Sequence, residues 1–240
     1  MPYRLSTFGF NDMMDCRARL RALFDDDTPW TLTGAAERAV EFFQRELVDD
    51  EGRPACALVR FFKTHPYADL PAELQDVVQK SVSQPAPDLR CLTLLATRGD
   101  EPAWNATKSS RGHRAIPLVS EDMVRQAPMI AQLITQLGLR IADVVRPDRA
   151  LMLEQGDATY NVFHVARALG SPHIVAQEEF VIPYAIESVL GFGGLLATGD
   201  LFTVIMFSKV PIPPDVADQF RVVALNLKVA ILPFARKPLM

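Results

Sequence analysis

The sequence is poor in the residues from which common catalytic and metal sites are built. Its 240 residues include three cysteines and four histidines. Cys16, Cys56 and Cys91 lie far apart, which excludes the close spacing of a zinc knuckle or a redox dithiol. Free cysteines without a disulfide framework are typical of a reducing compartment, so we expect a cytoplasmic protein.

Long apolar runs and clusters of basic residues are also missing. The longest apolar stretch, residues 189–207, is interrupted by Thr198-Gly199-Asp200, whereas a membrane helix needs about 20 largely uninterrupted apolar residues. With 29 acidic and 25 basic residues the net charge is −4, and the basic residues are scattered, unlike those of a nucleic-acid surface. Residues 1–4 lack the basic-then-apolar pattern of a signal peptide. We therefore expect neither a nucleic-acid partner nor a membrane span.

No catalytic signature is found in the sequence. It contains no Walker loop, no Gly-x-Ser-x-Gly elbow, no His-Glu-x-x-His pair and no kinase motif. Gly191, Gly193 and Gly194 lack the spacing of a phosphate loop, and we interpret them as a bulge or a close approach of another segment to a strand. We expect a protein that is not an enzyme, and the sequence identifies no cofactor.

Apolar periodicity predicts helices and strands along the whole chain. Helices are expected over residues 10–24, 33–47, 72–82, 120–138 and 213–231, and strands over residues 55–62, 89–97, 160–165, 186–196 and 201–208. Thr33 is the expected N-cap of the second helix. Thr198-Gly199-Asp200 is the expected turn of a hairpin. The polar residues 98–114 are interpreted as a functional flap or a mobile loop.

Three C-terminal motifs resemble those of the GAF family of sensory domains. Residues 184–192 (YAIESVLGF) resemble a family strand, residues 198–207 (TGDLFTVIMF) its returning strand, and residues 220–231 its closing helix. The resemblance implies an α+β fold with a central antiparallel sheet, helices packed on one face and a loop-closed pocket on the other. We therefore divide the chain into an N-terminal helical extension (1–32), a GAF-like domain (33–232) and a C-terminal tail (233–240).

The chain departs from the better-defined subgroups of that family. Gly191-Phe192-Gly193 stands where many members have Val-Pro, and Thr203 replaces an expected glycine. The ligand motifs of the cyclic-nucleotide-binding and tetrapyrrole-binding members are missing. The resemblance thus implies a signal-transduction sensor for an unidentified small molecule, which acts on a partner protein. Because terminal helices commonly pair in this family, it also implies a homodimer.

Five residues are candidates for contacts with that ligand. His164 and His173 precede the C-terminal hairpin, where they could ligate a haem iron or another metal, or donate to an anion. The alternative is a hydrogen-bonded loop histidine, because no carboxylate or cysteine stands beside them at a ligand spacing. Tyr160, Phe192 and Trp104 are candidate aromatic walls of a pocket, and core packing is the alternative.

Two rival functions stay open at this point. One is a dimerisation or protein-interaction module without a ligand, and the other is a haem-based gas sensor that uses His164 or His173. An enclosed pocket lined by Tyr160, His164 and Phe192 favours the small-molecule sensor, whereas a sheet face filled by its own side chains favours the interaction module. Glu178 and Glu179, taken as strand neighbours, point to opposite faces and do not form an acid–base pair.

Overall fold

The computed structural model describes residues 1–25, 31–110, 112–147, 161–235 and 239. Its main sheet has six strands: β3 (Cys56–Pro66), β4 (Arg90–Gly99), β5 (Ala115–Pro117), β6 (Val162–Val165), β7 (Ser188–Leu195) and β8 (Leu201–Ser208). Their order is β5-β4-β3-β8-β7-β6, and every neighbouring pair is antiparallel. Two short strands, β1 (Tyr3–Arg4) and β2 (Leu47–Val48), form a separate parallel pair.

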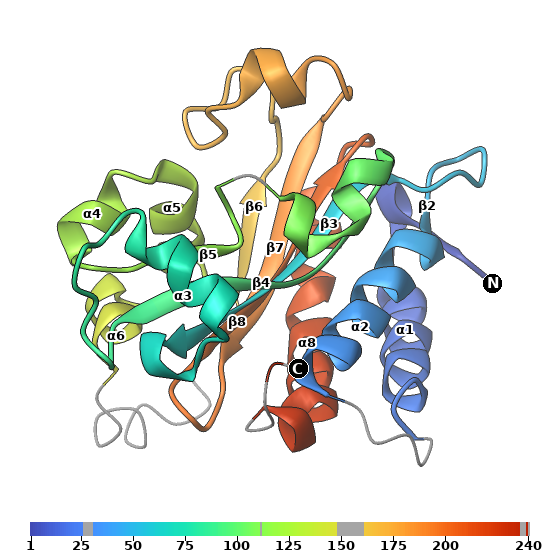
Figure 1. Cartoon of the computed structure of the whole chain (residues 1–240). Helices are drawn as coiled ribbons and strands as arrows, with labels where there is room; N and C mark the ends of the chain where they lie inside the picture. Colours follow the sequence, from blue (N-terminus) through green and yellow to red (C-terminus); the bar gives the residue numbers. More distant parts are fainter. Residues whose placement is uncertain (26–30, 111, 148–160, 236–238, 240) are drawn as a thin grey trace.

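Helices lie on both sides of this sheet (Figure 1). The longer ones are α1 (Phe10–Ala22), α2 (Leu32–Glu46) and α8 (Pro214–Ile231), and the shorter ones are α3 (Ala72–Gln79), α4 (Glu121–Arg125), α5 (Pro128–Gln136) and α6 (Ile141–Val145). Single turns complete the fold: η1 (Leu5–Thr7), η2 (Tyr67–Asp69), η3 (Pro102–Asn105), η4 (Thr107–Ser109), η5 (Gln177–Val181) and η6 (Leu232–Phe234). In Figure 1, α1, α2 and α8 group on one side of the sheet, and α4, α5 and α6 group on the other.

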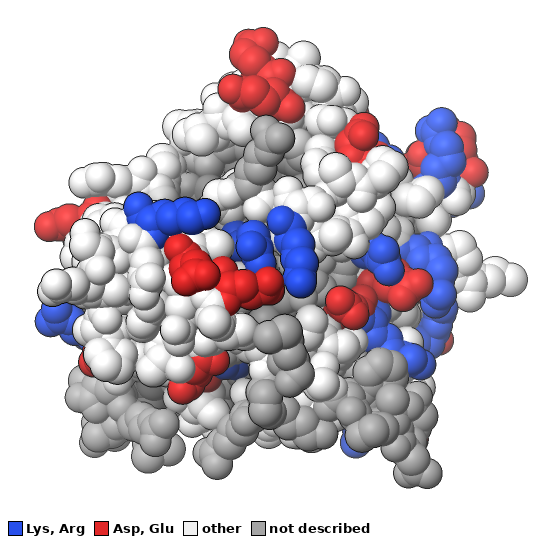
Figure 2. All heavy atoms as spheres, viewed as in Figure 1, with Lys and Arg blue, Asp and Glu red and all other residues white. Residues whose placement is uncertain are grey.

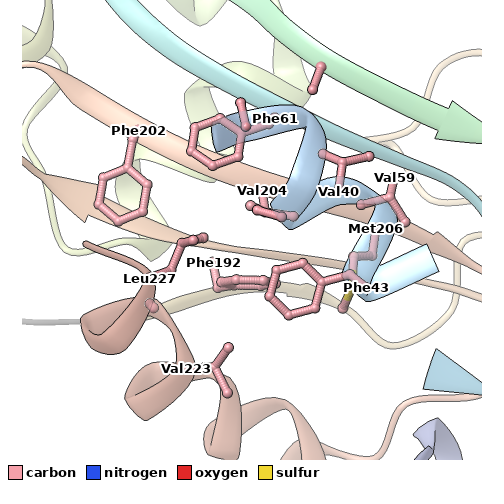
Figure 3. Close-up of a cluster of buried hydrophobic side chains, with 14 of the residues drawn as sticks. Val40, Phe43, Val59, Phe61, Phe192, Phe202, Val204, Met206, Val223 and Leu227 are labelled. Atoms are coloured by element: carbon pink, nitrogen blue, oxygen red, sulfur yellow. The ribbon is translucent and has the colours of Figure 1, made fainter. Parts of the chain in front are cut away.

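The face toward α2 and α8 is a closed hydrophobic core (Figure 3). At its centre, Phe192 of β7 packs against Phe43 of α2 and Phe220 of α8, with ring centroids 5.2 and 5.3 Å apart. All three side chains are fully buried. The buried stripe of α8 is the one that the sequence predicts: Val216, Ala217, Phe220, Val223, Ala224, Leu227 and Ile231. α1 packs against α8 and joins the same core.

A second hydrophobic core lies on the opposite face. Leu133 and Ile134 of α5 and Val124 of α4 are buried there against strand residues such as Phe163 and Ile205. The predicted α+β fold is therefore confirmed: a central antiparallel sheet has long helices packed on one face. Short helices and turns cover the other face, where the expected loop-closed pocket stays a prediction.

Two local expectations are wrong. The N-cap of α2 is Thr31, whose side chain accepts a hydrogen bond from the Gly34 amide at 3.0 Å, and not Thr33. Glu178 and Glu179 are not strand neighbours, because residues 177–181 form the π-turn η5. The amide of Ile182 donates to the carbonyl of Gln177 at 2.9 Å, so this backbone is satisfied locally and not by a neighbouring strand.

The predicted hairpin turn and the predicted close approach at the glycines are both confirmed. Gly199 has φ of 84°, and the Leu196 amide donates to the Asp200 carbonyl across the turn at 2.9 Å. A Cβ placed on Gly193 would lie 2.1 Å from the Phe202 carbonyl oxygen of β8. Glycine is the one residue without a Cβ atom, so any other residue at this position would displace the backbones of β7 and β8.

The proposed division of the chain at residues 32 and 232 stays a prediction. The described part of the N-terminal segment packs against α8 through buried residues that include Met13 and Leu20. Phe234 and Leu239, in the proposed tail, are buried in the same core. Both terminal segments thus contribute to the stability of the sheet and its helices.

We expect Gly193→Ala to lower the free energy of unfolding by about 1–3 kcal/mol or more, because the added methyl group overpacks the hairpin. Urea denaturation measures the change. Gly9→Ser is the matched control: its Cβ meets nothing closer than the Thr7 carbonyl at 3.8 Å, and serine suits a helix N-cap. Equal losses of stability in the two variants would contradict the close approach of β7 and β8.

Candidate functional site

The candidate site is built around Arg60 in the central strand β3. Strand neighbours alternate between faces, and Val59 and Phe61 belong to the core under α2 and α8. Arg60 therefore points to the face covered by α4, α5 and α6, together with Leu58 and Phe62. We call this side of the sheet, around Arg60, the Arg60 face.

Arg60 has no counter-charge among the residues that the structure describes. Its half-buried side chain makes no ion pair or hydrogen bond with them, and its Nε atom is sealed from solvent without a partner. Burial alone lowers the pKa of Arg60 to about 10, so the guanidinium still carries its charge at neutral pH. A buried charge without a partner costs several kcal/mol, and ordinary core packing gives no reason to keep one.

A second unpaired donor stands beside Arg60. Thr97 of β4 lies directly opposite Arg60 in the sheet register, and its buried Oγ1 has no hydrogen-bond partner among the described residues. Directly opposite residues in an antiparallel pair point to the same face, with Cβ atoms about 4.5–5.5 Å apart. The two side chains therefore start from neighbouring positions on one face of the sheet.

An aromatic cluster borders this pair of donors. Trp104 of η3 contacts Phe180 and Tyr184, with ring centroids 5.5 and 4.5 Å apart, and Phe180 packs edge-on against Phe207 of β8 at 4.9 Å. Phe207 lies opposite Leu58, two residues from Arg60 on the same face. A few polar donors beside an apolar wall are typical of small-molecule sites.

The structure separates the residues that the sequence proposed as ligand contacts. Trp104 lies on the Arg60 face, whereas Phe192 lies in the closed core on the other side of the sheet. His173 is half-buried in the loop before η5. Tyr160 lies outside the described residues. Trp104 and Phe192 thus do not line one common cavity, and the ligand contacts of all five residues stay predictions.

His164 is engaged by the protein itself. On β6 it lies opposite Leu190, and its Nε2 is 2.8 Å from the Ile212 carbonyl oxygen. Since a carbonyl only accepts, Nε2 carries the proton in this contact. Burial lowers the pKa of His164. The hydrogen bond to the Ile212 carbonyl acts in the opposite direction, because it favours the protonated form, but its effect is smaller. Binding of a haem iron at Nε2 would first have to break this hydrogen bond.

The sequence alone did not point to Arg60 and Thr97, although it contains one signal for Arg60. Residues 55–62 read ACALVRFF, with a single arginine inside an apolar strand. A long charged side chain in such a run is rarely buried without a partner. Thr97 gave no signal, because its role depends on the register between β3 and β4.

A second buried cluster differs from the Arg60 face because its charges are paired. The Asp200 carboxylate is 2.8 Å from Lys63 Nζ and 2.6 Å from Arg90 Nη1, and it accepts a 2.7 Å hydrogen bond from Thr198. Burial disfavours the ionised carboxylate, but the two cations outweigh it and hold the pKa of Asp200 below its usual range. The cluster ties the ends of β3 and β4 to the turn before β8, so we assign it a structural role.

His65 lies near that cluster and is almost completely enclosed. Its side chain is 6% exposed, and neither ring nitrogen has a hydrogen-bond partner among the described residues. Burial, helped by the charge of Lys63, lowers the pKa of His65 to about 3. The imidazole is therefore neutral in the folded protein at neutral pH.

A surface hollow of about 540 Å³ lies by α4 and α6, and Arg60 is not among its lining residues. Two of its arginines are paired: Arg125 is 2.7 Å from Glu121, and Arg140 is 2.7 Å from Asp143. On the side of the molecule shown in Figure 2, basic and acidic side chains are interspersed and form no broad patch of one sign.

In the described part of the chain, no three or more histidine, cysteine or acidic side chains come together as metal ligands would. None of its helices combines the length and the apolar character that crossing a bilayer requires.

Comparisons with known proteins place the chain near two solved structures. No protein-family model matches it, and no curated protein matches it. It is similar to the GAF domain of a phosphoenolpyruvate-protein phosphotransferase from Acinetobacter, with 11% identity and a TM-score of 0.41 over 92% of this chain and 93% of that one. It is also similar to CepR2, an N-acylhomoserine lactone dependent LuxR family transcription factor from Burkholderia cenocepacia, with 11% identity and a TM-score of 0.35 over 95% of each chain.

We expect Asp200→Asn to lower the free energy of unfolding by about 3–5 kcal/mol, because it leaves two buried cations without a carboxylate. Thermal or urea denaturation measures the loss. Asp100→Asn is the matched control: Asp100 makes an ion pair of the same length, 2.8 Å, with Lys209, but both side chains are about one-third exposed. That pair contributes about 0–1 kcal/mol. A similar small loss in both variants would contradict the structural role of Asp200.

We expect His65 to make the folded state less stable in acid. In the unfolded chain a histidine takes up a proton near pH 6.5, whereas folded His65 does so only near pH 3. The stability that neutral His65 confers is therefore complete above pH 6.5 and is lost as the pH falls from there to 3, by up to about 1.4 kcal/mol per pH unit. Urea denaturation across this range should show a shallower pH dependence for His65→Leu than for the natural protein. Equal slopes would show that His65 titrates normally.

Proposed function

We propose that this chain is a non-catalytic, cytoplasmic regulatory domain that senses a small molecule on the Arg60 face and signals to a partner protein. The observation that carries the proposal is the unpaired, half-buried Arg60 beside a buried, unpaired Thr97 hydroxyl. Both groups disfavour the unliganded fold, and a ligand that pairs with them removes that cost.

The difference between the two faces of the sheet supports this location for the ligand. Phe43, Phe192 and Phe220 fill the face under α2 and α8 with the protein's own side chains. A hydrophobic core fills the Arg60 face as well, but its strand residues include unpaired donors next to the aromatic cluster of Trp104. Among the described residues of that face, no histidine or cysteine pairs with a carboxylate, which supports binding over acid–base or nucleophilic catalysis.

We propose a homodimer that forms through α8. Besides its buried stripe, this helix carries a second apolar stripe at the surface: Leu225, Val229 and Leu232 are 41%, 53% and 44% exposed, and Val222 is half-buried. These four residues are spaced by three, four and three positions, which is the spacing of a two-helix seam. Pairing of α8 with its copy in a second chain would cover them.

The same helix gives a route from the ligand to the dimer. Val223 and Leu227 of α8 belong to the core under β7, which Figure 3 shows together with Phe192. Arg60 pairs across the sheet with Ile205 of β8, and β8 pairs with β7. A change in the position of β8 on ligand binding would therefore act on α8 through β7, since packed cores transmit small shifts.

Native mass spectrometry of the chain purified from its natural host tests both parts of the proposal. We expect the mass of a dimer with a retained small molecule. The double variant Leu225→Glu/Val229→Glu should be monomeric, because it buries like charges in the seam. The control Met123→Glu/Val175→Glu changes two other exposed apolar residues and should stay dimeric.

The outcomes separate the rival functions. A dimer without any retained molecule supports an interaction module in place of a sensor. A monomeric natural protein, or a dimer unaffected by the α8 variant, contradicts the seam. A Soret absorption band after addition of haem would support the haem sensor, and we expect none because His164 is engaged by Ile212.

A further inference from the structure

We propose that the ligand of the Arg60 face carries an oxyanion, a carboxylate or a phosphate, attached to an apolar or aromatic body. The inference rests on the proposed sensory function and names the chemical class that the site recognises.

The charge of Arg60 is the first reason. A guanidinium presents five N–H donors in a planar fork that matches two oxygens of a carboxylate or phosphate. None of these donors has a partner among the described residues. Nε is sealed from solvent, whereas the terminal nitrogens are not among the enclosed atoms without a partner. These terminal nitrogens are therefore the donors that we assign to the oxyanion.

The protein supplies no carboxylate for this position from the described acidic residues around the face. Asp100 is paired with Lys209 at 2.8 Å, and Asp143 with Arg140 at 2.7 Å. The buried cations of the other cluster, Lys63 and Arg90, do receive a carboxylate from Asp200. The missing negative charge at Arg60 is thus a local feature and not a general property of the sheet.

Thr97 and the aromatic cluster define the rest of the ligand. The Thr97 hydroxyl can donate to an oxygen that the guanidinium also binds, because the two residues lie directly opposite each other. Leu58 and Phe207 lie two residues further along the strands, about 7 Å away. That distance matches an anion on one ring or a short apolar chain.

Isothermal titration calorimetry on the full chain tests this inference with three probes of similar shape: benzoate, phenyl phosphate and neutral benzamide. We expect at least one anion to bind, and benzamide to bind roughly 10-fold more weakly or not at all. Arg60→Met keeps the length of the side chain without its charge and should weaken anion binding by about 10- to 100-fold. The affinity of Arg60→Lys for the anion should lie between those of the natural protein and Arg60→Met, because an ammonium keeps the charge but lacks the planar fork.

A stability measurement provides a readout that a merely structural arginine would not give. In anion-free buffer, Arg60→Met should melt at the same temperature as the natural protein or higher, because it removes an uncompensated buried charge. Saturating anion should raise the melting temperature of the natural protein and leave that of Arg60→Met unchanged.

Any of three results would overturn the inference: benzamide binds as tightly as the anions, neither anion binds at millimolar concentration, or Arg60→Met lowers the melting temperature in anion-free buffer. These results leave the sensory function standing if native mass spectrometry still finds a retained molecule. A protein that binds the anions but keeps no molecule from its host retains the anion site and loses the sensory proposal.

Discussion

A charged group in a partly dry site needs an opposite charge, and Arg60 lacks one among the described residues. The same sheet shows what the protein does when a buried cation serves the fold. Lys63 and Arg90 are held by Asp200 at 2.8 and 2.6 Å, and that cluster joins three strand ends. One sheet thus contains buried cations that a carboxylate neutralises and a buried cation without such a partner, and this difference indicates different roles. The paired cluster joins parts of the fold, and we propose that the unpaired arginine serves a ligand.

The two faces of the sheet have different roles in this account. The face under α2 and α8 is packed around Phe192, and β7 approaches β8 so closely at Gly193 that a methyl group would not fit. This packing makes a firm support for Arg60, which lies on β3 beside β8. α8 connects the support to the surface, because one side of the helix is buried and the other carries Leu225, Val229 and Leu232.

The C-terminal part of the fold was predictable because its signals are local. Thr198-Gly199-Asp200 favours a turn through glycine at positive φ, and the stripe of α8 follows helical periodicity. The π-turn η5 was not predictable, because the apolar run Phe180-Val181-Ile182 is typical of a strand. Its local hydrogen bonds depend on a bend at residues 176–177, which propensity does not reveal.

Most of the candidate site could not be predicted from the sequence. Arg60 is visible as a charge in an apolar strand, but its lack of a counter-charge depends on which acidic residues the fold brings near it. Thr97 and Arg60 are 37 positions apart in the sequence and meet only through the register of β3 and β4. Trp104 was proposed as an aromatic wall, and it does lie on the Arg60 face. Phe192 was proposed for the same role and lies on the opposite face, since strand alternation cannot be assigned before the register is known.

A crystal structure of the protein purified from its natural host is the most direct test of this account. The account predicts electron density for a bound molecule whose two oxygens lie within hydrogen-bond distance of the Arg60 guanidinium. A carboxylate of the chain itself, paired with Arg60 in that density, would contradict it.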